Sequence, residues 1–202
     1  MGEMVRPFDA QEAMEQALHA VLMYLILPLW IAAGFADWLC HRRTNIAETA
    51  GTKESVIHIL MFSQMGIAIC SAVFLSITSL TLCLMAGLLV AHQLTAYWDL
   101  RYASSKREIT PLEQQIHSLL EMLPFFALVL VCIANWPVFL ETVGIGDKEG
   151  TWGLDLRTPA LPTWYLVTIA SAVALFSALP YWVELAQCIA AGRRRASRSL
   201  PD

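Results

Sequence analysis

The chain has 202 residues, of which 57% are hydrophobic and 15% charged, whereas soluble globular proteins have about 45–50% apolar and 25% charged residues. This composition predicts an integral membrane protein. The chain length is taken up by the predicted membrane spans, so we expect no separate soluble domain. The net charge of −4 argues against nucleic acid as a partner, because nucleic-acid-binding domains present a basic face.

Five apolar stretches follow one another along the chain, and each is long enough to cross a bilayer, which takes about 20 apolar residues. A polar break of Ser76, Thr78 and Ser79 separates the second stretch from the third, since a single helix through both would be too long for a bilayer. We therefore expect an all-α fold, a single transmembrane domain over 1–202 with five transmembrane helices. The helices are predicted at about 16–41, 54–77, 78–100, 111–140 and 161–192.

The basic residues are divided unequally between the two predicted membrane faces. Cytoplasmic loops carry the excess of Lys and Arg, so the face with ten of them is expected to be cytoplasmic. The N-terminus then lies outside and the C-terminus inside, and we expect the bacterial inner (plasma) membrane. The ten are Arg42, Arg43, Lys53, Arg101, Lys106, Arg107, Arg193, Arg194, Arg195 and Arg198, against Arg6, Lys148 and Arg157 on the other face.

Ionisable residues inside the predicted helices cluster at the cytoplasmic end. Such residues are rare in membrane spans and mark functional sites, and residues three, four or seven apart share one helix face. Four helices would each present a polar face at this end. The candidates are Asp37 and His41 on the first helix, Glu54 and His58 on the second, His92 and Asp99 on the third, and Glu113, His117 and Glu121 on the fourth.

The order of these residues repeats, with an Asp followed by a Glu-x-x-x-His pair in each half. The repeat predicts two hairpins, about 16–77 and 78–140, that form a pseudo-two-fold four-helix bundle around a di-metal site, with the fifth helix outside this core. Glu54 and Glu113 would be the bridging carboxylates.

Some of these residues have simpler explanations. The T-P-L-E motif that ends at Glu113 is typical of a capping box, and Glu54 falls in a first helical turn, where the helix dipole favours an anion. Capping does not explain Asp37 and Asp99, which fall in last turns. Pairing of histidines with carboxylates in the absence of a metal is an alternative. Glu184, on the fifth helix, is interpreted as a lone carboxylate solvated towards the cytoplasm and is left outside the predicted site.

Carboxylate and imidazole ligands without thiolates favour iron, with manganese or zinc as alternatives. At the level of motifs, the pattern over about 37–121 resembles the integral-membrane non-haem di-iron (carboxylate/histidine) proteins of the hydroxylase and desaturase kind. It differs from the soluble di-iron bundles, which space the pair as Glu-x-x-His, and from the desaturases, which have H-x-x-H-H boxes.

The resemblance implies two bound metal ions and an oxidoreductase that activates dioxygen on a lipid or other apolar substrate at the cytoplasmic membrane face. It also implies a cytoplasmic electron donor, because the sequence has no flavin, haem or iron–sulfur motif. Two other classes stay open. One is a membrane zinc hydrolase that acts on a lipid, with three protein ligands and a spare carboxylate as general base. The other is a metal-ion carrier or sensor.

Overall fold

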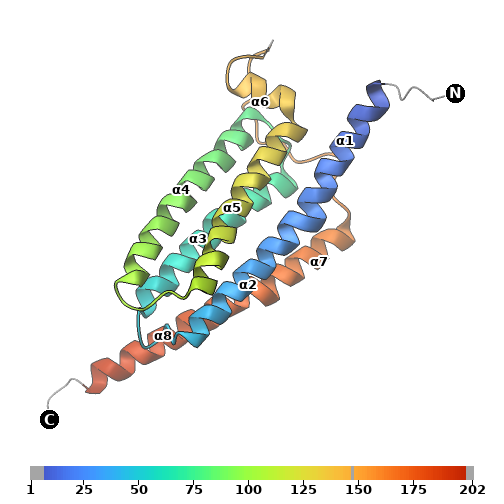
Figure 1. Ribbon diagram of the computed structural model, residues 1–202. Helices are drawn as coiled ribbons and strands as arrows, with labels where there is room; N and C mark the ends of the chain where they lie inside the picture. The colour runs from blue at the N-terminus through green and yellow to red at the C-terminus, as the bar shows by residue number, and fades with distance from the viewer. Residues whose placement is uncertain (1–6, 147, 199–202) are drawn as a thin grey trace.

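The computed structural model describes residues 7–146 and 148–198, and the secondary structure of this part of the chain is helical (Figure 1). Five helices are long and apolar enough to cross a membrane, in agreement with the prediction of an all-α membrane protein. They run over Gln11–Arg43, Thr52–Phe74, Ser79–Ser104, Pro111–Ala134 and Thr163–Arg198. The helical elements are α1 (Pro7–Val21), η1 (Leu22–Ile26), α2 (Leu27–Arg43), α3 (Thr52–Phe74), α4 (Ser79–Ser104), α5 (Pro111–Ala134), α6 (Trp136–Thr142), α7 (Thr163–Val173), η2 (Ala174–Ala178) and α8 (Leu179–Arg198).

The polar break between the second and third spans is a helix boundary. Thr78 has extended backbone angles, and its hydroxyl accepts a hydrogen bond from the Thr81 backbone N–H, while the Thr81 hydroxyl accepts one from the Thr78 N–H. These reciprocal bonds form a capping box. The Thr78 hydroxyl also donates to the Gly153 carbonyl at 2.9 Å, which attaches the loop before α7 to this turn.

Two of the long helices contain a π-helical turn just before a proline. Leu27, which precedes Pro28, donates its backbone N–H to the Leu22 carbonyl, and Leu179, which precedes Pro180, donates to the Ala174 carbonyl. Proline cannot donate the next helical hydrogen bond, and an i to i−5 turn accommodates that loss without ending the helix. The first and fifth spans are therefore each one continuous path, α1–η1–α2 and α7–η2–α8.

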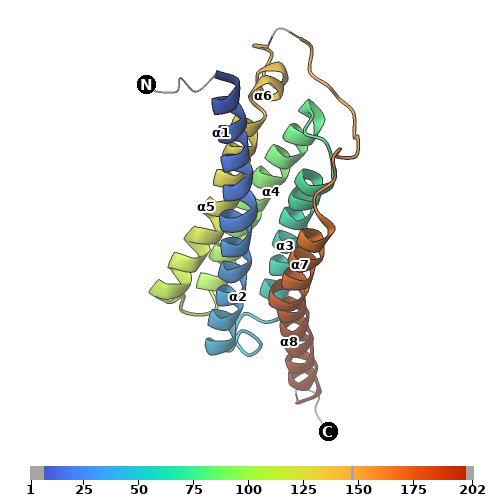
Figure 2. The ribbon, with the colours of Figure 1, turned by 90° about the vertical axis from the view of Figure 1, so that its right-hand side faces the viewer.

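The five spans pack side by side, with α3 against α4 and α2 against α5 (Figures 1 and 2). The fifth span is part of the bundle, because α8 packs against α3 and α2, and η2 packs against α2. The prediction that this helix lies outside a four-helix core is wrong. Its polar residues, which the repeat pattern did not include, therefore face the same interior as those of α2 and α3.

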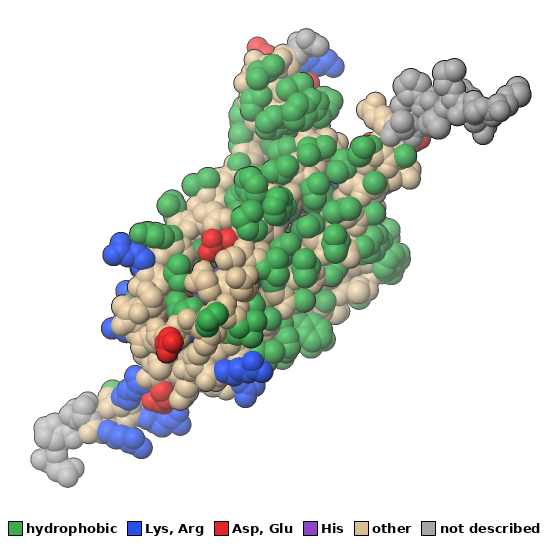
Figure 3. Space-filling model, viewed as in Figure 1, with side chains coloured by type: hydrophobic (Ala, Val, Ile, Leu, Met, Phe, Trp, Pro, Cys, Tyr) green, Lys and Arg blue, Asp and Glu red, His purple; other side chains and the backbone are tan. Residues whose placement is uncertain are grey.

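On the face that Figure 3 shows, hydrophobic side chains gather over much of the helical body, and most Lys and Arg side chains lie towards the end where α8 terminates (Figure 3). The ends of α2 and α4 and the starts of α3 and α5 lie at this same end (Figure 1). The ten-residue basic set therefore belongs to one end of the bundle. Arg6, counted for the opposite face, lies outside the described residues.

Replacement of Thr78 by Ala removes the N-cap of α4 and the bond to Gly153, so we expect the free energy of unfolding to fall by about 1–2 kcal/mol. Titration with dodecyl sulfate in mixed micelles measures this change. The control is Thr168→Ala, since the exposed Thr168 hydroxyl bonds only to its own helix at Trp164, and its loss is expected to be below about 0.5 kcal/mol. Equal losses for the two variants would contradict a role for the cap.

Candidate metal centre

Seven of the nine predicted site residues converge at the basic end of the bundle. They come from four helices, which agrees with the prediction that each presents a polar face there. Six are buried, with at most 4% of the residue exposed, and the His117 side chain is 12% exposed. The seven are Asp37 and His41 on α2, Glu54 and His58 on α3, Asp99 on α4, and Glu113 and His117 on α5.

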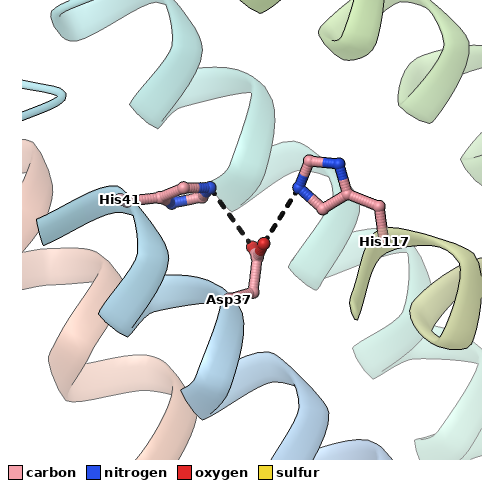
Figure 4. A group of neighbouring side chains, drawn as sticks. All are labelled: Asp37, His41 and His117. Carbon is pink, nitrogen blue, oxygen red and sulfur yellow. Dashed lines mark ion pairs between the residues drawn. The ribbon is translucent and has the colours of Figure 1, made fainter. Parts of the chain in front are cut away.

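Asp37 lies between two histidines from different helices (Figure 4). Its Oδ1 is 2.9 Å from His117 Nε2, and its Oδ2 is 3.5 Å from His41 Nε2. Glu113 Oε1 is 3.7 Å from His41 Nε2 and 4.0 Å from His117 Nε2. Two imidazole nitrogens and two carboxylates thus surround one small space.

A second group lies beside the first, formed by Glu54, His58 and Asp99. One ligand atom of each residue lies within 4.8 Å of the others, and all three residues are buried. His58 Nε2 is 3.3 Å from Asp99 Oδ2, while Asp99 Oδ1 is buried without a hydrogen-bond partner among the described residues.

Glu184 joins the two groups. Its Oε2 lies 3.1 Å from Nδ1 of His41 and its Oε1 lies 3.2 Å from Nδ1 of His58, and the two imidazole rings stack with centroids 4.3 Å apart. The interpretation of Glu184 as a solvated lone carboxylate is wrong, because the residue is only 2% exposed. In the sequence, its position inside the apolar fifth span was the one indication of a role for Glu184. Its neighbours are set by the packing of α8 against α3.

Arg107, in the loop between α4 and α5, connects Glu54 and Glu113. Its Nη2 lies 2.6 Å from Glu54 Oε1 and 2.5 Å from Glu113 Oε1, and its side chain is 3% exposed. Although burial disfavours the charge, hydrogen bonds with Glu113 and Glu54 raise the pKa of Arg107 above its ordinary value. In the sequence, Arg107 is one basic loop residue among several, since no motif distinguishes it from Lys106 nearby.

The capping explanation accounts for only part of this arrangement. The Thr110 hydroxyl accepts a bond from the Glu113 backbone N–H at 3.2 Å, so the T-P-L-E motif does begin α5. The Glu113 carboxylate, however, accepts hydrogen bonds from Arg107 rather than from the backbone of the cap. The Glu54 carboxylate does the same, so neither side chain serves as a cap.

The other two predicted ligands lie farther along the bundle. His92 is buried and Glu121 is half-buried, but neither belongs to the groups of potential ligands found among the described residues. Both line a cavity that reaches Asp37, His58, Asp99 and His117. The structure thus places them next to the cluster without making them part of it.

The residues present fit a metal ion. Two atoms that bind one ion at about 2.1 Å each are at most about 4.2 Å apart. His41 Nε2 has no hydrogen-bond partner among the described residues, yet carboxylate oxygens lie 3.5 and 3.7 Å from it. These separations are too long for a good hydrogen bond and are suited to shared coordination. The buried His, Asp and Glu groups could therefore hold metal ions.

Comparisons with known proteins add no relative, because no protein-family model matches the chain and the searches of curated proteins and solved structures find no significant match.

Replacement of Arg107 by Ala leaves two buried carboxylates without their cation. In chelator-treated protein, we expect a loss of about 3–5 kcal/mol in the free energy of unfolding, the range for one broken partner of a buried ion pair. Arg101→Ala is the matched control, because Arg101 is exposed and its guanidinium lies over the face of Tyr97, with its Cζ 5.9 Å from the ring centroid. Comparable stabilities of the two variants in dodecyl sulfate titrations would refute this role of Arg107.

Proposed function

We propose that this protein is an integral-membrane oxidoreductase with a di-metal centre, most simply di-iron, that acts with dioxygen on an apolar substrate. The observation that supports it most is the pair of stacked histidines held by one carboxylate. An ionised carboxylate has only acceptor atoms. Glu184 therefore accepts two hydrogen bonds, one from Nδ1 of His41 and one from Nδ1 of His58. Each Nε2 is then directed to its own group of carboxylates.

One ion would be held by Asp37, His41 and His117, with Glu113 beside them, and the other by Glu54, His58 and Asp99. Both sets correspond to groups whose potential ligand atoms, one from each residue, lie close enough for coordination. A ligating histidine commonly donates its second ring N–H to a carboxylate, which fixes its tautomer and orientation. Glu184 has this supporting position for both ions.

The balance of charge favours metal ions over pairing among the side chains alone. Five carboxylates, those of Asp37, Glu54, Asp99, Glu113 and Glu184, face one guanidinium. With neutral histidines, four negative charges remain, which two divalent cations neutralise. Pairing without metal instead needs protonated histidines. If both rings of the stacked pair, whose centroids are 4.3 Å apart, were protonated, they would repel by about 4 kcal/mol at an effective dielectric constant of 20.

Bound iron would supply the reduction of dioxygen and the oxidation of the substrate. The protein residues orient the site, because Arg107 holds Glu54 and Glu113 while Glu184 holds His41 and His58. A cytoplasmic electron donor would deliver electrons, since this end of the bundle has the basic residues typical of cytoplasmic loops. The pairing of a carboxylate with a histidine on each of α3 and α5 is the part of the arrangement that resembles di-iron proteins, whereas the Glu-x-x-x-His spacing differs from theirs.

Metal analysis of the purified protein tests the centre. We expect two iron ions per chain in the native protein and loss of metal in His58→Ala and in His117→Ala, because each removes a ring nitrogen from one of the groups. His19→Ala is the control, since His19 lies at the other end of the first span and should retain the full metal content. One zinc ion per chain would support the hydrolase instead, and absence of metal would refute both enzymes.

Oxidoreductase activity has its own measurement. The iron-loaded protein, reduced without air, should consume dioxygen when it is admitted, and His117→Ala should lose most of this uptake. Mössbauer spectra taken before and after admission would show whether the iron changes oxidation state. A metal-loaded protein that neither consumes dioxygen nor changes its spectrum would overturn the oxidoreductase assignment. The proposal of a metal centre would still stand.

The orientation has a separate test in reporter fusions. If the basic end faces the cytoplasmic side of a bacterial inner membrane, a phosphatase that is active only on the outer side of that membrane should be inactive when fused at the C-terminus. The same reporter inserted after Lys148 should be active, because the loop between α6 and α7 lies at the opposite end (Figure 1). Reversed activities would place the metal centre at the outer membrane face.

A further inference from the structure

A cavity of about 450 Å³ runs from the polar cluster into the membrane-spanning part of the bundle. On α3, its lining includes His58, Met65, Gly66, Ile69 and Val73, so it follows almost the whole helix. The rise from His58 to Val73 is about 22 Å, within a hydrocarbon core of about 30 Å. The cavity is therefore elongated along α3.

The two ends of the cavity differ in polarity. The far end is lined by apolar residues of α2, α3 and α7, among them Leu27, Val73 and Leu166. The near end reaches Asp37, His58, Asp99 and His117, together with Tyr181 of α8. A molecule that matches both ends has an apolar chain and one polar terminus.

His92 adds an independent sign of a polar ligand in this cavity. It lines the cavity, is 5% exposed, and its Nδ1 has no hydrogen-bond partner among the described residues. A buried ring nitrogen without a partner costs free energy, which a polar group of a ligand would recover. Glu121 also lines the cavity, and Gln93, the residue after His92, donates a side-chain hydrogen bond to the Glu121 backbone carbonyl at 3.0 Å.

We propose that this cavity binds one hydrocarbon chain of an amphiphile from the membrane leaflet next to the metal cluster. The polar terminus lies by His92 and Tyr181, and the methyl end points towards Val73. The cluster lies at the helix ends, near the lipid headgroups, so the opposite orientation would bury a polar group in the apolar half of the cavity. The inference rests on the proposed function in one respect, namely that the carbons nearest the polar terminus are those at which the enzyme would oxidise its substrate.

Photo-crosslinking of the full-length purified protein tests both the site and the orientation. The probes are two long-chain fatty acids, one with a diazirine next to the carboxylate and one with a diazirine next to the methyl end. We expect the first to label peptides around His58 and Tyr181 and the second to label the peptide around Val73. Excess unlabelled fatty acid should compete with both. Reversed labelling would overturn the orientation, and labelling that is spread over lipid-facing surfaces without competition would overturn the binding site.

Two glycines offer matched variants. A Cβ atom added at Gly66 or at Gly87 would meet no atom within 4 Å, but only Gly66 lines the cavity. Gly66→Leu should therefore place a side chain in the path of the ligand and reduce competed labelling about tenfold, equivalent to about 1.4 kcal/mol. Gly87→Leu, on an exposed part of α4, should leave labelling unchanged. Equal labelling of the two variants would refute the cavity as the binding site.

The iron content of the same samples separates this inference from the proposed function. Neither glycine belongs to the metal cluster, so both variants should bind as much iron as the native protein. Iron without competed labelling would overturn the chain-binding inference alone. Competed labelling in the predicted pattern without iron would overturn the di-iron proposal and leave an amphiphile-binding protein.

Discussion

Negative charge is concentrated in the interior of the helical bundle at one of its ends, and the other residues of the site are arranged around this charge. Carboxylates of Asp37, Asp99 and Glu184 are buried where water cannot screen them, and uncompensated charges there would cost several kcal/mol each. Cations must therefore balance them. Arg107 supplies one charge, and the remaining need is the physical reason for the proposed metal ions.

The long helices meet this requirement because they do not stop at their prolines. The π turns before Pro28 and Pro180 let α1–η1–α2 and α7–η2–α8 continue to the polar end, where they present His41 and Glu184. A helix that ended at Pro28 would stop well before His41, and one that ended at Pro180 would stop about one turn before Glu184. The turns also add a residue to the local helical repeat, which changes the face that the following segment presents to the bundle.

The same geometry divides the interior into two chemically different parts. Close ion pairs and hydrogen bonds fill the polar end, whereas the apolar half retains the cavity along α3. Polar groups at the cluster lose much of their stabilisation if their partners are absent, which favours a rigid arrangement of paired side chains. The apolar half has no such directional requirement, since dispersion contacts can be made equally well by a bound hydrocarbon chain.

The all-α class, the number of apolar spans and seven residues of the cluster follow from the amino-acid sequence alone. Hydrophobic length and i, i+4 spacing are local properties, so pairs such as Glu54 with His58 can be read directly from the chain. The places of Glu184 and Arg107 within the cluster, and of His92 and Glu121 on the adjoining cavity, emerge only when the helices are packed together. Their roles depend on which helices are neighbours and how each is rotated, and that is set by packing between segments distant in sequence.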